Sequence, residues 1–171
     1  MSKGIIAIPI AQGVEDLEYH VPRMRLEEEG YTVLSAGLTK AEVIGKNGLI
    51  ITVDVLISDL NADQLCGIIL AGGWAPDKLR RYPEVINLIK KINQQNKVIG
   101  IICHGGSMAI SADILKGKKA TGSLGIKDDL VNAGATWVDE SAFIEGNLVW
   151  GRVVADIPNF CAALVKALNK A

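Results

Sequence analysis

Short runs of isoleucine, leucine and valine alternate with helix-like segments along most of this 171-residue chain. Four of these runs are predicted to form strands, at residues 4–11, 31–36, 66–71 and 98–102. We expect the sheet that they form to be central and buried. Helix-like segments cover residues 16–29, 83–96, 105–114, 126–133 and 156–171. Strands that alternate with helices form parallel sheets with helices on both faces, so the sequence predicts an α/β fold.

Shorter signals fill the gaps between these segments. A hairpin is expected over 42–52 around the turn 45–48, and a second pair of strands over 136–138 and 142–150. Residues 58–64 favour a short capped helix. Pro22 should kink the first helix or leave one of its backbone hydrogen bonds unmade.

Composition narrows the class of protein. Apolar residues make up 49% of the chain and the formal net charge is −1, which is typical of a globular protein without a nucleic-acid or membrane surface. The first apolar run is too short to span a membrane and lacks a signal-peptide pattern. We therefore expect one cytoplasmic domain over residues 1–171.

The cysteines and histidines argue against a metal site. The three cysteines, Cys66, Cys103 and Cys161, form no CxxC pair, and the two histidines, His20 and His104, are too few for a multi-histidine site. The sequence predicts free thiols, no metal and no cofactor.

Cys103 carries the strongest chemical signal. It follows the buried run 98–102 directly, and small residues that favour a helix begin at Gly105. A thiol at such a turn lies at the positive end of the new helix, which should depress its pKa and favour the nucleophilic thiolate. The same geometry forms the nucleophile elbow of other hydrolases.

Two further strand ends should meet Cys103 at one edge of the sheet. The first strand leads to Glu15 and the third leads to Gly72 and Gly73. An acid, an N–H-rich loop and a nucleophile together suit acyl or carbonyl chemistry. Glu15 is equally typical of an acidic first helical turn. We expect His104 to point away from the sulfur.

At these residues the chain resembles the ThiJ/PfpI superfamily, and most of all its PfpI-type intracellular cysteine peptidases. The similarity extends from Gly4 to the final helix. The matching stretches are 14–18 (VEDLE), 25–30 (RLEEEG), 70–77 (LAGGWAPD), 102–105 (ICHG), 110–112 (ISA), 115–118 (LKGK), 125–129 (GIKDD) and 132–135 (NAGA).

The resemblance implies a flavodoxin-like three-layer sandwich with a mostly parallel central sheet. It implies that Cys103 is the nucleophile and that Glu15, protonated, lies close to its sulfur. It also implies that His104 pairs with Asp77 of a neighbouring subunit, and that N–H groups near Gly73 and His104 form an oxyanion hole. A homo-oligomer, a dimer or a hexamer, is therefore expected.

The substrate pocket departs from the family pattern. Gly72, Trp74, Ser123 and Arg152 are expected to line it, but Ser123 replaces a common aromatic residue or histidine. Residues 106–107 are Gly-Ser where the family often has Pro-Gln, and residues 151–154 keep only the arginine of a Ser-Arg-x-Pro motif. These changes affect the pocket rim and leave the nucleophile in place.

Three functions fit these residues. The sequence favours the first, an intracellular peptidase or amidase in which Cys103 attacks a peptide carbonyl, with a role in stress or in protein and metabolite quality control. The second is a glyoxalase or deglycase in which Cys103 adds to the aldehyde of methylglyoxal. The third is a non-enzymatic redox sensor that uses oxidation of Cys103. The fold class hosts more than one function and does not choose among them.

Overall fold

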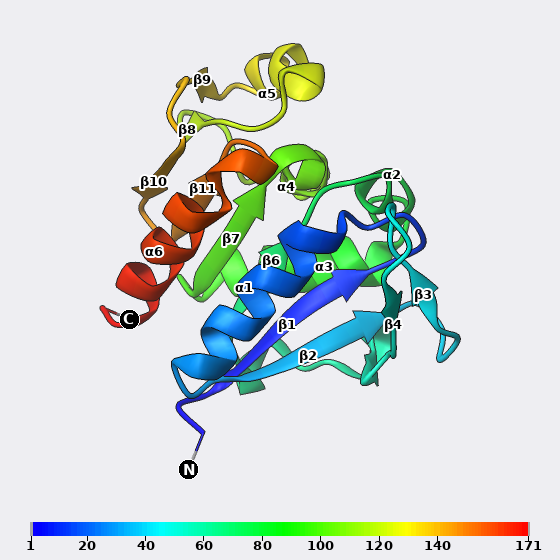
Figure 1. The fold of residues 1–171 in the computed structure, drawn as a ribbon. Coiled ribbons are helices and arrows are strands. Elements are labelled where there is room, and N and C mark those ends of the chain that lie inside the picture. Colours follow the sequence, from blue (N-terminus) through cyan, green and yellow to red (C-terminus); the bar gives the residue numbers. More distant parts are fainter. Residues whose placement is uncertain (1, 171) are drawn as a thin grey trace.

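A seven-stranded sheet organises the computed structural model, which describes residues 2–170 (Figure 1). Its strand order is β10-β11-β7-β6-β1-β2-β5. All neighbouring strands are parallel except β10, which runs antiparallel to β11. The strands are β1 (Ile5–Ile10), β2 (Thr32–Gly37), β5 (Val55–Leu56), β6 (Leu65–Leu70), β7 (Val98–Ile102), β10 (Ala142–Glu145) and β11 (Leu148–Gly151).

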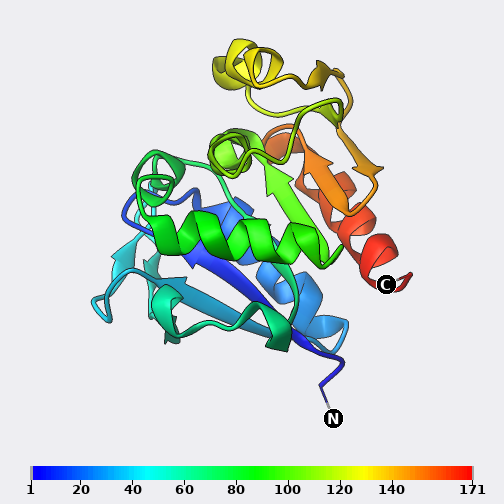
Figure 2. The same ribbon diagram turned by 180° about the vertical axis from the view of Figure 1, so that it is seen from behind.

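Helices cover both faces of this sheet. Helices α1 (Asp16–Glu28) and α6 (Ile157–Leu168) lie on the face toward the viewer in Figure 1, and α3 (Pro83–Gln94) covers the opposite face in Figure 2. The mostly parallel sheet and the flavodoxin-like three layers are thus confirmed. No helix within residues 2–170 combines the length and apolar character needed to cross a membrane.

Short elements gather beyond the carboxyl ends of the strands. They are α2 (Ala75–Leu79), α4 (Gly106–Ser111), α5 (Lys127–Asn132), the pair β3 (Val43–Ile44) and β4 (Ile50–Ile51), and the pair β8 (Lys119–Ala120) and β9 (Thr136–Trp137). The β3–β4 pair is the predicted hairpin. In parallel sheets this edge holds the functional residues, so these elements surround any site.

Several predicted elements differ in extent. Residues 58–64 form two 3₁₀ turns, Ile57–Asp59 and Ala62–Gln64, instead of one helix. Helix α4 ends at Ser111 and not at residue 114, because the chain turns at Asp113, which has a φ of 54°. Helix α1 continues through Pro22. The predicted last helix ended at residue 171, which lies outside the described residues.

Two glycines let α6 approach the sheet closely. A Cβ on Gly100 in β7 would lie 2.7 Å from Leu164 Cδ2, and one on Gly151 in β11 would lie 2.9 Å from Phe160 Cβ. Phe160 and Trp150 are fully buried in this part of the core. A side chain at either glycine would therefore push α6 away from the sheet.

The turn after β7 is pressed against the neighbouring strand β6. Gly105 has helical dihedral angles, with φ of −54° and ψ of −27°. A Cβ at this position would lie 2.0 Å from the carbonyl oxygen of Leu70. The glycine is therefore required by the close backbone approach and not by its conformation.

We expect Gly105→Ala to lower the free energy of unfolding by about 3 kcal/mol, because the backbone must shift to relieve the overlap. Gly117→Ala is the control, since Gly117 has a φ of 75° but open space where a Cβ would lie. It should lower the unfolding free energy by about 1 kcal/mol, the scale of left-handed strain alone. Urea denaturation of both variants measures the difference. Equal losses would contradict the close approach of Gly105 to Leu70.

Candidate functional site

Cys103 occupies a strained turn between β7 and α4. Its φ is 56°, in the left-handed region that residues with a Cβ rarely adopt. A single 3₁₀ turn, Cys103–Gly105, connects it to α4. The thiol is half-buried at the carboxyl edge of the sheet. This is the predicted nucleophile elbow.

The carboxyl group beside the sulfur belongs to Glu18, which was not among the residues predicted from the sequence. Glu18 is completely buried, and its Oε2 accepts a hydrogen bond of 2.7 Å from the Gly72 N–H. A Cβ on Gly72 would lie 2.5 Å from Glu18 Oε2 and 3.0 Å from Cys103 Cβ, so Gly72 lies between the two. Glu18 Oε1 has no hydrogen-bond partner within the described residues.

Glu15 has a different position from the one expected. It is the N-cap of α1, where its Oε2 accepts the Glu18 N–H at 2.9 Å. Its Oε1 accepts from Asn47 Nδ2 at 3.1 Å. Glu15 lines the same cavity as Cys103, but its hydrogen bonds join it to the helix and the hairpin. The carboxyl against the thiol is therefore Glu18, one helical turn later.

A sequence signal for Glu18 did exist. The buried residues Glu18, Pro22 and Leu26 recur at every fourth position of α1, so they share the face that packs on the sheet. An acid on a buried helix face is rare without a partner or a function. Glu15 precedes the helix and does not belong to this series, so the spacing identifies Glu18 as the acid on the buried face.

Burial and the Glu18 carboxylate raise the pKa of the Cys103 thiol to about 12. Burial likewise raises the pKa of Glu18 to about 7, although the Gly72 N–H opposes the rise. The expected depression of the Cys103 pKa is therefore wrong: one 3₁₀ turn and the short helix α4 do not offset lost solvation beside a carboxylate. Near neutral pH, Cys103 therefore keeps its proton while Glu18 is partly ionised.

His104 does not point away from the sulfur as expected. Its Nδ1 lies 3.4 Å from Cys103 Sγ. Burial lowers the pKa of His104, and the Lys46 charge adds to this effect, so both favour the neutral ring. On the other side of the ring, Nε2 lies 3.3 Å from the position that a Cβ would occupy at Gly125. Within residues 2–170 no carboxylate forms a salt bridge with the ring.

Asp77 and Gly73 lie at the same cavity. The Asp77 side chain is exposed on α2 and pairs with Arg81 of its own chain. Gly73 has a φ of 78°, and a Cβ there would lie 2.4 Å from the Glu15 amide nitrogen, so its backbone is held at close quarters beside the cavity. Pairing of Asp77 with His104 of another chain, and an oxyanion hole at Gly73 and His104, remain predictions.

The expected substrate-binding residues divide into two groups. Trp74 and Ser123 line a cavity of about 550 Å³ that contains Cys103. Gly72 is buried and does not line it, and its N–H is bonded to Glu18. Arg152 does not line it either. Its guanidinium binds Asp139 at 2.7 Å and Asp156 at 2.9 Å.

Lys46 and Ser107 also line this cavity, and neither was predicted from the sequence. Lys46 comes from the β3–β4 hairpin, which only tertiary packing brings to the elbow. Within residues 2–170, no group of three or more histidine, cysteine or carboxylate side chains is arranged to hold a metal ion.

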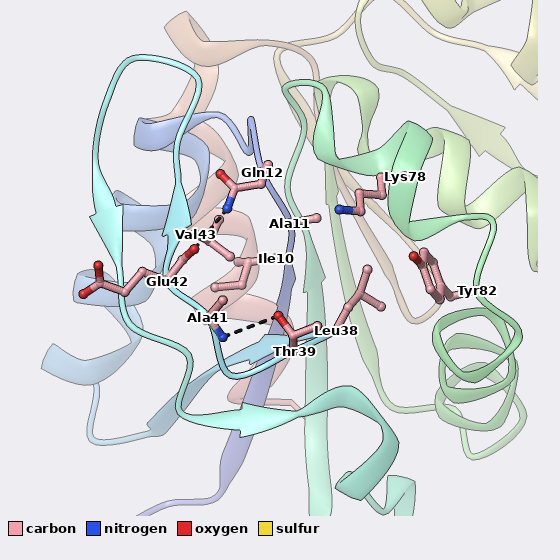
Figure 3. A pocket seen from close by; sticks show the side chains of 10 residues that line it. All are labelled: Ile10, Ala11, Gln12, Leu38, Thr39, Ala41, Glu42, Val43, Lys78 and Tyr82. Carbon is pink, nitrogen blue, oxygen red and sulfur yellow. Dashed lines mark hydrogen bonds between the residues drawn. The ribbon is translucent and has the colours of Figure 1, made fainter.

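A second, smaller cavity of about 90 Å³ lies beside the base of the hairpin (Figure 3). Its lining contains neither a cysteine nor a histidine. At its rim Gln12 Nε2 donates to the carbonyl of Glu42 at 3.0 Å, the hydrogen bond drawn between these residues in Figure 3. The nucleophile thus belongs to the larger cavity.

Known proteins match nearly the whole length of this chain. A model of the DJ-1/PfpI family matches residues 5–167. A deglycase from Pyrococcus abyssi is 37% identical over 164 residues, which cover 96% of this chain and 99% of the relative. The deglycase PfpI from Pyrococcus furiosus is 36% identical over 159 residues, which cover 93% and 96% respectively.

Solved structures agree on the fold. A two-domain protein from Anabaena variabilis, with DJ-1/ThiJ/PfpI-like and ferritin-like domains, superposes with a TM-score of 0.95 at 34% identity. The match covers 98% of this chain and 48% of that one. Schizosaccharomyces pombe DJ-1 gives a TM-score of 0.87 at 20% identity, covering 96% and 95%, and shows the fold alone.

The raised pKa of Glu18 makes stability depend on pH. The folded state keeps the Glu18 proton up to about pH 7, whereas the unfolded chain releases it near 4.5. The folded state therefore binds more protons in this window, and its stability falls as the pH rises through it. Below about pH 4.5 the raised pKa of Glu18 costs the folded state no stability. Above about pH 7 it costs the folded state about 3 kcal/mol.

Glu18→Gln removes this titration and keeps an acceptor for the Gly72 N–H. We expect the unfolding free energy of the variant, minus that of the wild type, to grow by about 3 kcal/mol from pH 4 to pH 8. Urea denaturation across this range measures it, and titration of groups far from Glu18 cancels in the difference. Parallel pH profiles of the two proteins would rule out the buried, protonated Glu18.

Proposed function

This chain belongs to the DJ-1/PfpI family, and on that premise we propose that it is a cysteine-dependent enzyme of the glyoxalase or deglycase type. Its substrate would be methylglyoxal or an early adduct of methylglyoxal with an amine. The observation that carries the proposal is the buried Glu18 carboxyl against Cys103, a second acid that can hold the proton of the thiol. The names of the Pyrococcus relatives support the same interpretation.

Addition to the aldehyde is the first step. The thiol proton moves to Glu18 as the sulfur attacks the aldehyde carbon, a carbon–sulfur bond forms, and the carbonyl electron pair moves to oxygen. This oxyanion then takes the proton from Glu18, which leaves a neutral hemithioacetal and a Glu18 carboxylate. N–H groups at Gly73 and His104 would stabilise the oxyanion. The free oxygen of Glu18, Oε1, is the atom available for these transfers.

Rearrangement needs no external oxidant. The Glu18 carboxylate removes the hydrogen on the former aldehyde carbon as a proton, and the ketone oxygen becomes protonated, which gives an enediol. Protonation of the former ketone carbon and loss of the other hydroxyl proton give a thioester. One carbon is oxidised and its neighbour is reduced. Water then breaks the carbon–sulfur bond and releases lactate and the thiol.

Deglycation requires one earlier bond cleavage. In an amine adduct of methylglyoxal the aldehyde carbon carries a hydroxyl and the amine nitrogen. The carbon–nitrogen bond breaks, the nitrogen takes a proton, and the free amine leaves as the carbon–sulfur bond to Cys103 replaces it. The remaining steps are the same. The cavity of about 550 Å³ is large enough to admit such an adduct.

A single copy of this chain does not supply every group that peptide hydrolysis requires. His104 would act as the base, and a cysteine peptidase uses a third group to orient that base. Asp77 of a neighbouring subunit in a homo-oligomer would be this group, and within its own chain Asp77 pairs with Arg81. The Glu18 carboxyl against the Cys103 sulfur instead suits proton transfer on a small carbonyl compound. Oxidation of Cys103 as a redox sensor remains compatible with the same half-buried thiol.

We expect purified protein to convert methylglyoxal to lactate, and Cys103→Ser to abolish this activity. Glu18→Gln should lower kcat/KM about a hundredfold, the scale of a lost acid–base group. Cys66→Ser is the matched control, because this second half-buried cysteine lies at the opposite edge of the sheet, against Ile5, and should retain full activity. Lactate formation is followed with a coupled dehydrogenase assay.

A parallel assay with peptide–coumarin substrates separates the two enzyme classes. Release of coumarin that depends on Cys103, with no lactate from methylglyoxal, would overturn the proposal in favour of the peptidase. Activity in neither assay, with peroxide adding mass at Cys103 first, would favour the redox sensor.

A further inference from the structure

Lys46 is held above the cavity by a clamped hairpin loop. Its backbone N–H donates to the Val14 carbonyl at 2.8 Å. The N–H groups of Asn47 and Leu49 donate to the two carboxylate oxygens of Asp16, at 2.8 and 2.7 Å. These bonds fasten the loop to the first turn of α1, the turn that also carries Glu18.

The base of the hairpin is fastened as well. Gln12 donates to the Glu42 carbonyl, as Figure 3 shows, and accepts from the Ile44 N–H at 3.0 Å. The Gly13 N–H donates to the Ile44 carbonyl at 2.9 Å. Because the loop is fixed at both ends, the stem of Lys46 starts from a defined position at the cavity mouth.

The ammonium group of Lys46 lacks an acidic partner among the residues that the structure describes. It lies 5.7 Å from the centroid of the Trp74 ring, and no carboxylate of residues 2–170 lies within salt-bridge distance of it. Lys46 is the only lysine or arginine among the described residues that line the cavity. Lys46 is exposed, and a cation left unpaired beside a cavity is available to a ligand.

The carboxylates that line the cavity have partners other than Lys46. Both oxygens of Glu15 accept hydrogen bonds from the protein, and Asp77 pairs with Arg81. Glu18 is completely buried, and its Oε2 accepts a hydrogen bond from the Gly72 N–H. Lys46 acts electrostatically on the centre of the site, because its charge helps to lower the pKa of His104.

We propose that Lys46 binds an acidic group on the substrate, so that the enzyme prefers 2-oxoaldehydes that carry a negative charge a few bonds from the aldehyde. This inference rests on the proposed carbonyl activity of Cys103. Trp74 would cover the carbon chain of such a substrate, while Lys46 forms a charge-assisted hydrogen bond to its carboxylate.

The probes are 4,5-dioxopentanoate, which is a 2-oxoaldehyde with a carboxylate, and its uncharged methyl ester. We expect the wild type to show about a tenfold higher kcat/KM for the acid, the scale of one charge-assisted hydrogen bond at a partly exposed site. Lys46→Met should abolish this preference and Lys46→Arg should keep it. Lys78→Met is the control, because Lys78 lies on α2 beside the smaller cavity, and should keep the wild-type ratio.

Salt gives a readout that a merely structural role of Lys46 would not move. Raising ionic strength from about 0.02 to about 0.5 M should reduce the acid-to-ester ratio of the wild type and leave that of Lys46→Met unchanged. If Lys46→Met fails to fold, Lys46→Gln replaces it in both measurements.

The outcomes distinguish the two proposals. Lack of lactate from methylglyoxal with the wild type overturns the carbonyl activity itself. Turnover of methylglyoxal with equal kcat/KM for the acid and the ester overturns the role of Lys46 alone. A loss in Lys46→Met that is equal for both probes also overturns it, because it would assign the ammonium to the oxyanion and not to the substrate charge.

Discussion

The hydrogen bond from the Gly72 N–H to Glu18 Oε2 joins two of the parts on which the site depends and holds them beside the third, Cys103. Gly72 follows β6, Glu18 belongs to α1, and Cys103 begins the turn after β7. The bond holds a carboxyl group in a place where burial alone would expel it. A side chain at Gly72 would occupy the same space, so the contact between acid and thiol requires a glycine there.

The first turn of α1 links the chemistry to the rim of the cavity. Glu18 lies against Cys103, while Glu15 and Asp16 accept hydrogen bonds from residues 47 and 49 of the β3–β4 hairpin. Pro22 lies four residues after Glu18 and offers no N–H to the Glu18 carbonyl, so the helix accepts a missing bond at this turn. A shift of this turn would move the acid and the hairpin together.

Much of the fold could be predicted from sequence, and the site only in part. The long apolar runs indicated the central strands because burial on both faces leaves an unbroken signal. Strands β5 and β8 have two residues each, and α2 has five, too few to show a period. The position of Cys103 on an elbow followed from its place between a strand and small residues.

The remaining site residues depend on tertiary geometry. Glu15 and Glu18 are three residues apart, and only the helix phase decides which one reaches the sulfur. The pKa of Cys103 depends on burial and on Glu18, which the local pattern around residue 103 does not contain. Arg152 matched a family motif, yet its charge is used by Asp139 and Asp156.

The left-handed backbone of Cys103 has an evolutionary consequence. A residue with a Cβ loses about 1 to 2 kcal/mol in this conformation, whereas glycine adopts it freely. Selection for stability alone would therefore replace this cysteine by glycine, and only selection for sulfur chemistry opposes the change. In a gene copy that loses this chemistry but is still selected for a stable fold, position 103 should change to glycine, so the residue found there marks whether a descendant still performs chemistry.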